Sequence, residues 1–190
     1  SSKHLLGLIN DVLDMSKIES GKLTLTTEQI SLKEVVEGIV NIMQPQVKTK
    51  KQTFDIHVEN ILTENVWCDG VRLNQVLLNL LSNATKYTPE SGSIQLSLSE
   101  EKSPKGDNYV RIHIKVKDNG IGMSPDFLKK IYESYSRADG ARIHKTEGAG
   151  LGMAITKYIV DAMEGTIDIK SELDKGTEFV LTFDFEKAVA

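Results

Sequence analysis

The chain has 190 residues, of which 39% are apolar and 26% charged, proportions that are ordinary for a folded globular protein. Its formal net charge of −4 argues against a nucleic-acid-binding protein, because such proteins carry a basic stripe that neutralises phosphates. The single cysteine, Cys68, excludes an internal disulfide and fits a reducing compartment. No apolar run reaches membrane-spanning length, so we expect no membrane contact by this chain.

Hydrophobic periodicity predicts a short leading helix followed by one larger α/β unit. Ser31 with Glu34 three residues later predicts a capping box, and Asp69 is a second expected N-cap. The expected elements, in chain order by type, are helices over residues 2–19, 32–47, 70–88, 125–132 and 151–162 and strands over residues 22–29, 53–58, 65–68, 93–99, 109–117, 166–171 and 178–185.

These elements predict an α+β fold in two layers, with a largely antiparallel sheet and helices on one face. We divide the chain into residues 1–21, the leading helix, and residues 22–190, the α/β unit. The chain begins inside a helical pattern without a methionine, so we expect it to be a piece of a longer protein. The polar stretch within residues 119–149 is long for a loop and is typical of a functional lid.

The helix over residues 70–88 presents one row that suits a magnesium–polyphosphate complex. Gln75, Asn79, Asn83 and Lys86 recur at steps of three or four residues, so they share a face. Amide oxygens are hard ligands for Mg²⁺, an ammonium group attracts phosphate, and Tyr87 offers a ring for a base. An ordinary amphipathic helix with a solvated amide face explains this segment alone equally well.

Two glycine-containing motifs follow. Asp118-Asn119-Gly120-Ile121-Gly122 comes after a strand, where glycines permit close approach of a ligand and the acid can accept from an exocyclic amine. By itself this motif is also a plausible strand-to-helix turn. Residues 147–152 (Glu-Gly-Ala-Gly-Leu-Gly) open a helix whose exposed N–H groups favour an anion. Met153 replaces the third glycine of the dinucleotide fingerprint, and no Gly-Lys-Ser/Thr occurs, which excludes a P-loop.

Together these blocks resemble, in order, the ATP-binding domain of sensor histidine kinases, a superfamily shared with gyrase, MutL and a heat-shock chaperone. The resemblance runs from about Asp69 to Phe183, and the leading helix is similar to the second helix of the kinases' dimerisation domain. It implies a Bergerat-type α/β sandwich that binds ATP and Mg²⁺. It further implies a cytoplasmic domain of a membrane-bound bacterial sensor.

The resemblance also implies roles for individual residues. Asn83 and Asn79 correspond to the metal-binding asparagines, Lys86 to the phosphate-contacting lysine, and Tyr87 to the residue that packs on the nucleotide. Asp118 corresponds to the carboxylate that reads the adenine amino group. The catalytic set implied is Asn79, Lys86 and Arg137. The remaining positions implied to bind or surround the nucleotide are Gly120, Gly122, Met123, Tyr132, Tyr135, Arg137, Gly148, Ala149, Gly150, Leu151, Gly152 and Thr177.

The chain departs from the family pattern at two places. Ala149 stands where the family often has Ser or Thr, and the missing hydroxyl is expected to cost on the order of 1 kcal/mol of affinity. Tyr132 and Tyr135 replace lid phenylalanines, a change that is tolerated where the hydroxyls reach water.

Asn79 indicates phosphoryl transfer rather than hydrolysis. Hydrolysing members of the superfamily carry a glutamate there, whereas an amide cannot serve as a general base at neutral pH. The family's phosphoacceptor is a histidine followed by an acidic residue, and none of the four histidines in the chain fits. His4, His57, His113 and His144 are followed by Leu, Val, Ile and Lys. We therefore expect the acceptor to lie outside this chain, which would then not autophosphorylate alone.

Two other functions stay open from the sequence: a nucleotide-gated interaction module without catalysis, and a true ATPase. The partners that the resemblance implies are ATP, the receiver domain of a response regulator and, in the full-length protein, a second copy. The resemblance implies that this chain contains only half of the helices of the dimerisation bundle, so we expect either a weak dimer or a monomer.

Overall fold

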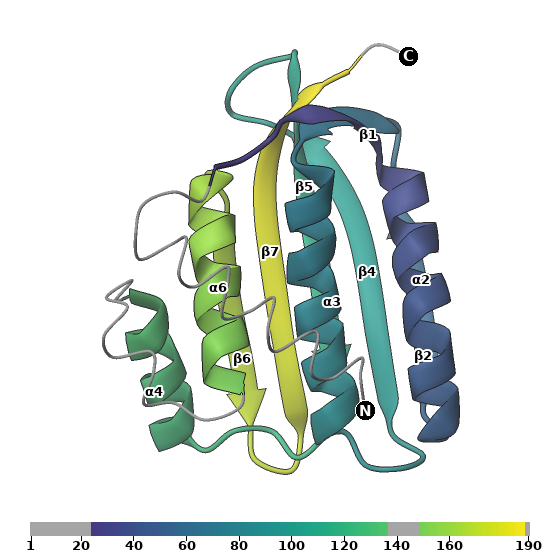
Figure 1. Ribbon diagram of the computed structural model, residues 1–190, viewed down its shortest axis with the longest axis vertical. Helices are drawn as coiled ribbons and strands as arrows, with labels where there is room; N and C mark the ends of the chain where they lie inside the picture. The colour runs from purple at the N-terminus through teal and green to yellow at the C-terminus, as the bar shows by residue number, and fades with distance from the viewer. Residues whose placement is uncertain (1–23, 137–148, 189–190) are drawn as a thin grey trace.

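The computed structural model describes residues 24–136 and 149–188, and these form a seven-stranded sheet covered by helices (Figure 1). The helices are α2 (Leu32–Thr49), α3 (Gly70–Tyr87), α4 (Pro125–Ser136) and α6 (Ala149–Ala162). The strands are β1 (Glu28–Ser31), β2 (Thr53–Glu59), β3 (Asn65–Cys68), β4 (Ser93–Lys102), β5 (Tyr109–Asp118), β6 (Thr166–Glu172) and β7 (Gly176–Lys187).

The sheet is mixed but mainly antiparallel, as predicted. Its strand order is β1-β3-β7-β5-β4-β2, and β6 pairs with β7 beside this path. The β2–β4 pair is parallel, and the other pairs are antiparallel. The long β7 has β5 along one edge, while β3 and β6 share the other. This register brings Asp118, at the end of β5, opposite Thr177 at the start of β7.

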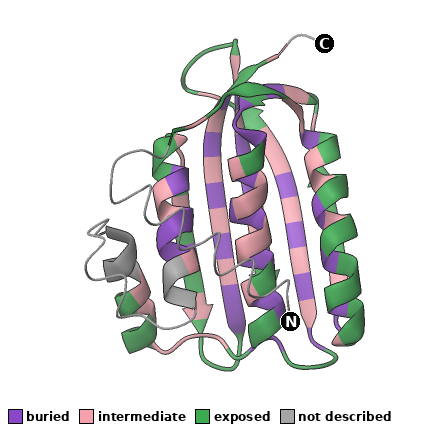
Figure 2. Ribbon diagram, viewed as in Figure 1, coloured by how far each residue is buried: buried purple, intermediate pink, exposed green. Residues whose placement is uncertain are grey.

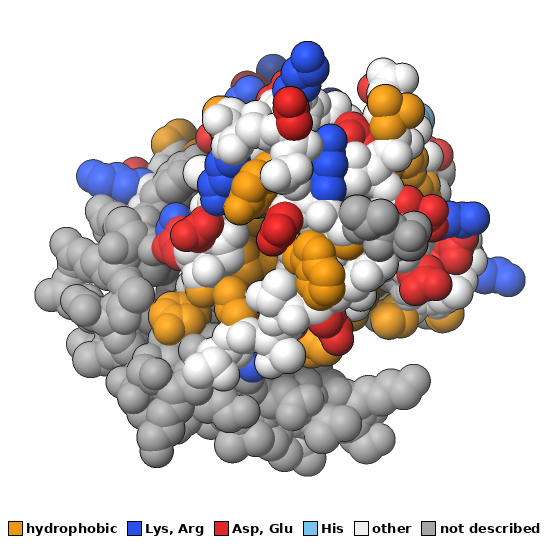
Figure 3. Space-filling model, turned by 90° about the horizontal axis from the view of Figure 1, so that it is seen from above, with side chains coloured by type: hydrophobic (Ala, Val, Ile, Leu, Met, Phe, Trp, Pro, Cys, Tyr) orange, Lys and Arg blue, Asp and Glu red, His pale blue; other side chains and the backbone are white. Residues whose placement is uncertain are grey.

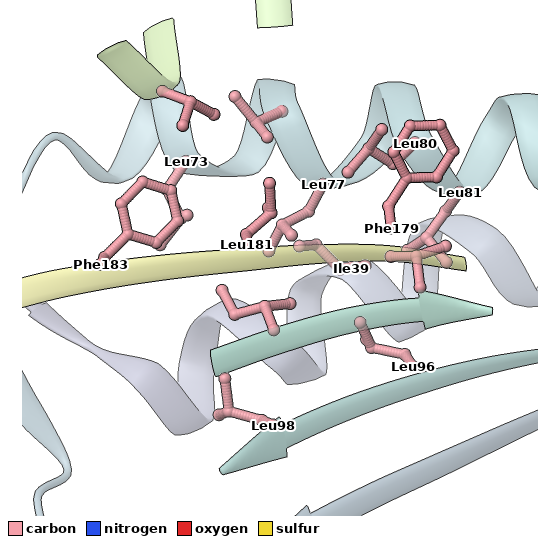
Figure 4. Close-up of a cluster of buried hydrophobic side chains, with 14 of the residues drawn as sticks. Ile39, Leu73, Leu77, Leu80, Leu81, Leu96, Leu98, Phe179, Leu181 and Phe183 are labelled. Atoms are coloured by element: carbon pink, nitrogen blue, oxygen red, sulfur yellow. The ribbon is translucent and has the colours of Figure 1, made fainter. Parts of the chain in front are cut away.

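The described helices lie on one face of the sheet, and the core fills the space between the two layers (Figures 1 and 2). Burial alternates along β4, β5 and β7, because successive side chains of a strand point to opposite faces. The apolar stripe of α3 packs against the inward side chains of β7, with Leu181 and Phe183 at 0% exposure (Figure 4). This packing fixes which side of α3 is left to face a ligand.

Both predicted helix starts are confirmed. Ser31 is the N-cap of α2, and its hydroxyl accepts from the Glu34 N–H at 3.2 Å. Asp69 is the N-cap of α3, where one carboxylate oxygen accepts from the Arg72 N–H at 3.1 Å. Its other oxygen accepts from the Thr26 N–H at 2.8 Å, which holds the segment before β1 against the start of α3.

The structure differs from the sequence prediction mainly near the N-terminus. A strand was expected over residues 22–29, but the strand in this region, β1, covers Glu28–Ser31. Its length is set by its partner β3, which offers only Asn65–Cys68 for pairing. The leading helix expected over residues 2–19 lies outside the described residues, as does His4. Within the described ranges no helix has the length and apolar character needed to cross a membrane.

Basic and acidic side chains are interspersed over the described part of the end view in Figure 3. The outward face of the sheet shows the same mixture. Arg111 on β5 makes two 3.0 Å contacts with the carboxylate of Asp184 on β7, and these lower the pKa of Asp184.

Candidate functional site

The predicted residues of α3 and β5 meet at a cavity of about 360 Å³ beside the C-terminal end of α3. This volume lies within the range of small-molecule sites, about 300–1,000 Å³. Six of the sequence-predicted residues line it directly: Asn83, Tyr87, Asp118, Gly122, Met123 and Thr177. The other lining residues are Ala84, Ile121, Ser124, Phe127, Ile131, Met153, Leu173 and Phe179.

Asp118 is the buried acid of this cavity, with 8% of its surface exposed. Burial raises the pKa of the Asp118 carboxyl above its ordinary value, and the backbone N–H groups of Gly120 and Thr177 partly offset this. The Gly120 N–H donates to Oδ1 at 2.9 Å. A carboxylate fixed by backbone donors in a largely apolar wall can accept from one more donor, such as an exocyclic amine.

The loop after β5 is held by the hairpin between β6 and β7. The Ser171 hydroxyl accepts from the Met123 N–H at 2.8 Å and lies 2.8 Å from Thr177 Oγ1. Gly122, at φ +67°, approaches this hairpin so closely that an added Cβ would lie 2.0 Å from the Glu172 carbonyl oxygen. The Asp174 N–H donates to the Ile121 carbonyl at 2.8 Å. The hairpin therefore builds one wall of the cavity.

Replacing Gly176 by alanine is expected to lower the free energy of unfolding by about 1–3 kcal/mol more than Gly106→Ala does. Gly176 and Gly106 share positive φ angles of +113° and +121°, so both variants carry the same kind of backbone strain. They differ in space: a Cβ at Gly176 would lie 2.0 Å from the Asp118 carbonyl oxygen, whereas nothing lies within 4 Å at Gly106. Urea unfolding of both variants measures the difference, and equal losses would contradict the steric argument.

Asn79 lies one helical turn before Asn83 but contacts α6 rather than lining the cavity. Its Nδ2 donates to Thr156 Oγ1 at 2.8 Å, and a Cβ added at Gly152 would lie 2.6 Å from its Oδ1. Gly152 is thus required for the close approach of α6 to α3. Gly120 is likewise required for the loop after β5 to approach the end of α3, because an added Cβ there would lie 2.4 Å from the Tyr87 carbonyl oxygen.

Lys86 and Tyr87 are the last two residues of α3. Tyr87 is 37% exposed and contributes to the cavity wall, while Lys86 is exposed and lies outside the lining set. The Lys86 ammonium is 5.4 Å from the centroid of the Tyr87 ring, a cation–π geometry. An exposed ammonium beside Tyr87, a residue of the cavity wall, is suited to a part of a ligand that extends out of the cavity.

The donor set beside the cavity fits a divalent cation of the magnesium type. Asn83 Nδ2 contacts Met153 Sδ at 3.7 Å, which uses the donor side of the amide and leaves its carbonyl oxygen as a hard ligand. Among the residues that the structure describes, no group of three or more His, Cys, Asp or Glu side chains could hold a metal.

Several predicted residues fall at the ends of the described ranges or outside them. Arg137 and Gly148 lie outside the described residues, as does His144. Tyr132 and Tyr135 fall in the last turns of α4, and Ala149, Gly150 and Leu151 in the first turn of α6, where only the backbone is described.

Sequence reasoning missed most of the apolar wall. Ile121, Phe127 and Leu173 line the cavity although 55%, 46% and 53% of their surfaces are exposed. Single exposed apolar residues are common, so none of them stands out in the sequence. Of these three residues, Ile121 alone had a local signal that could have identified it, because it lies between the two glycines of the Asp118 motif. The cluster around it forms only when α4 and the β6–β7 hairpin are folded against the loop.

Residues 68–187 match the family described as "Histidine kinase-, DNA gyrase B-, and HSP90-like ATPase". Among similar curated proteins is the autoinducer 2 sensor kinase/phosphatase LuxQ of Vibrio vulnificus, 38% identical over 98% of this chain and 22% of its own length. Sensor histidine kinase GacS of Pseudomonas protegens is 32% identical over 98% of this chain and 20% of its length. The chain thus spans about a fifth of the length of these relatives.

Solved structures show the same fold. Full-length ShkA in complex with AMPPNP matches with a TM-score of 0.77 and 30% identity, over 98% of this chain and 37% of that one. The Acinetobacter baumannii histidine kinase AdeS matches with a TM-score of 0.68 and 24% identity, over 96% and 79%. With a family match over more than half of its residues, the chain belongs to the histidine kinase-, DNA gyrase B- and HSP90-like ATPases.

Proposed function

We propose that this chain is the Mg·ATP-binding catalytic domain of a two-component sensor histidine kinase and transfers the γ-phosphate to a histidine outside the chain. The observation that carries the proposal is the meeting of Asp118 and Asn83 on one largely apolar cavity. A buried acceptor suits the amino group of adenine, and an amide oxygen suits the metal of a nucleotide complex. The names of the similar sensor kinases support the same assignment.

In this mechanism the chain's residues act by positioning. Asp118 accepts from the adenine amino group, Tyr87 and Ile121 cover the base, and Asn83 supplies an oxygen ligand on the phosphate side. Lys86, beside Tyr87, neutralises phosphate charge, and Arg137 has the same task at the γ-phosphate. Mg²⁺, held with the help of the Asn83 side-chain oxygen, would supply positive charge that stabilises the negative charge developing on the phosphate. The lone-pair nitrogen of a neutral imidazole attacks the γ-phosphorus, and the bond from that phosphorus to the β–γ bridging oxygen breaks, so that ADP leaves with this oxygen. The proton on the other imidazole nitrogen passes to the acidic residue that follows the acceptor histidine or to water.

Asn79 favours transfer over hydrolysis. A general base must take a proton from water, and an amide cannot do so at neutral pH. The Asn79 amide also donates to Thr156 at 2.8 Å, which orients its carbonyl oxygen toward the glycine-rich start of α6. That orientation suits support of the metal and the phosphates.

The setting of the domain follows from the same assignment. The protein as a whole would be a bacterial membrane-bound sensor that acts as a homodimer, with this domain on the cytoplasmic side. Its phosphorylated histidine would pass the group to a response-regulator receiver domain. Residues 1–21 would belong to the dimerisation domain, and residues 22–190 to the catalytic domain.

Transfer of label from [γ-³²P]ATP tests the proposal. The chain alone should acquire no acid-labile label, whereas an added two-helix acceptor domain carrying a histidine should become labelled in the presence of Mg²⁺. Tight Mg·ATP binding without any transfer would instead identify a nucleotide-gated interaction module. Steady phosphate release that disappears in Asn83→Ala would identify an ATPase and contradict the interpretation of Asn79.

A further inference from the structure

The C-terminal end of α3 is capped by side chains from a distant part of the chain. Thr88 follows α3 in an extended conformation, at φ −102° and ψ 128°, so the helix ends without the left-handed glycine that commonly serves its last carbonyls. The corner between α2 and β2 supplies the donors instead. Lys50 Nζ donates to the carbonyl oxygens of Thr85, Lys86 and Thr88 at 2.8, 3.0 and 2.8 Å.

Gln52 completes this cap. Its Nε2 donates to the carbonyl oxygens of Thr85 and Thr88 at 3.0 and 2.6 Å, and the residue is only 9% exposed. We call Lys50 and Gln52 the α3 clamp. An ammonium group at a helix C-terminus meets the negative end of the helix dipole, and charged donors form stronger hydrogen bonds than neutral ones. The clamp is therefore a strong local restraint on the last turn of α3.

The clamped turn carries two residues of the cavity wall. Tyr87 lies between the clamped residues Lys86 and Thr88, and Asn83 lies one helical turn earlier. The Tyr87 carbonyl accepts from the Ile121 N–H at 3.1 Å, so the same turn also touches the loop that follows Asp118. A shift of this turn would separate the Asn83 and Tyr87 side of the cavity from the Asp118 side.

We propose that Lys50, assisted by Gln52, is a positioning residue that holds the end of α3 in its nucleotide-binding arrangement before the nucleotide arrives. The proposal rests on the function proposed above, since it concerns the same cavity. Without the clamp, α3 spends part of its time with a frayed last turn. The apparent dissociation constant then rises in proportion to the loss of the competent population, so a fall to about one fifth raises it about fivefold.

Lys50→Met tests this with Lys51→Met as its matched control. Methionine keeps the length of the stem but removes the donors, and Lys51 is the adjacent exposed lysine, at φ 57°. We expect Lys50→Met to raise the dissociation constant of a fluorescent Mg·ATP analogue about fivefold, measured well below the unfolding temperature. Lys51→Met should bind as the unaltered chain does. A purely structural Lys50 would lower the melting temperature and leave this constant unchanged.

Hydrogen–deuterium exchange separates this inference from the proposed function, because it needs no nucleotide. In Lys50→Met, amides at the end of α3 should exchange faster than in Lys51→Met, while those of β5 and β7 stay protected. Lys50→Arg, which keeps several donors, should restore protection and affinity in part. Unchanged exchange at the end of α3 would overturn the clamp, whereas faster exchange in a chain that binds no nucleotide would support the clamp and overturn the proposed function.

Discussion

Replacing Asp118 by alanine is expected to weaken the binding of an Mg·ATP analogue by about 10- to 100-fold. A hydrogen bond to a charged group contributes about 1.5–3 kcal/mol, and each 1.4 kcal/mol corresponds to about a tenfold change in the dissociation constant. Asp118 is the only acid among the described residues that line the cavity, so no neighbouring carboxylate can take over its part. Isothermal titration calorimetry or fluorescence titration measures the change.

Asp168→Ala is the matched control for this experiment. Asp168 is an exposed aspartate on β6, outside the cavity lining, so its removal should leave the affinity unchanged. Equal affinities for Asp118→Ala and Asp168→Ala would mean that the base is read elsewhere. Circular dichroism of both variants checks that the sheet is intact. This check is needed because Asp118 also accepts a hydrogen bond from the Gly120 N–H, which Asp118→Ala removes.

The raised pKa of Asp118 gives this interaction a recognisable pH dependence. Protonation of the Asp118 carboxyl places an O–H donor where the amino group of the base also donates, and two donors cannot hydrogen-bond to each other. The affinity for adenosine should therefore fall as the pH decreases through the raised pKa of Asp118. Adenosine is the suitable ligand because it has no phosphate that titrates.

Folding stability should change with pH in the opposite sense. The folded chain binds the Asp118 proton more tightly than the unfolded chain does, so the stability due to Asp118 falls as the pH rises through the same window. Both effects should vanish in Asp118→Asn.

Local signals in the sequence were sufficient to predict most of the fold. The capping residues Ser31 and Asp69 and the alternation along β4, β5 and β7 are short-range patterns, and each appears in the structure where it was expected. The bounds of β1 were not predictable in this way, because they are set by pairing with β3 more than thirty residues later. Local alternation carries no information about the length of a partner strand.

The same distinction applies to the site. Residue type and spacing left the roles of Asn83 and Asp118 open. Their proposed roles came from the order of the motifs, which resembles the ATP-binding domain of histidine kinases, and both residues line the cavity. The hairpin residue Leu173 and the α3 clamp were not recognisable in the sequence, since a surface leucine and a loop lysine have no distinctive local pattern. Their positions depend on contacts between segments that are far apart in the chain. Asn79 shows an intermediate case: its helix face was predicted, but its contact with Thr156 on α6 was not.

Asn83→Ala is expected to remove the dependence of nucleotide affinity on Mg²⁺ and to reduce phosphoryl transfer to an added acceptor by about 100-fold or more. Loss of residues that merely orient metal ligands costs about 10- to 100-fold, and Asn83 is proposed to contact the metal itself. Its amide lies on the cavity wall with the donor side occupied by Met153, so the lost group is the oxygen ligand. Analogue titrations with Mg²⁺ and with EDTA, together with transfer rates, measure both effects.

Asn74→Ala is the appropriate comparison, because it removes the same side chain from the same helix at a position outside the cavity lining. It should leave the Mg²⁺ dependence and the transfer rate unchanged. The pattern across variants is what locates the metal. Asn83→Ala should retain its affinity for adenosine, which carries no metal, whereas Asp118→Ala should lose it. If Asn83→Ala weakened adenosine as much as Mg·ATP, the residue would be part of the base pocket, and the metal would have to be held by other residues.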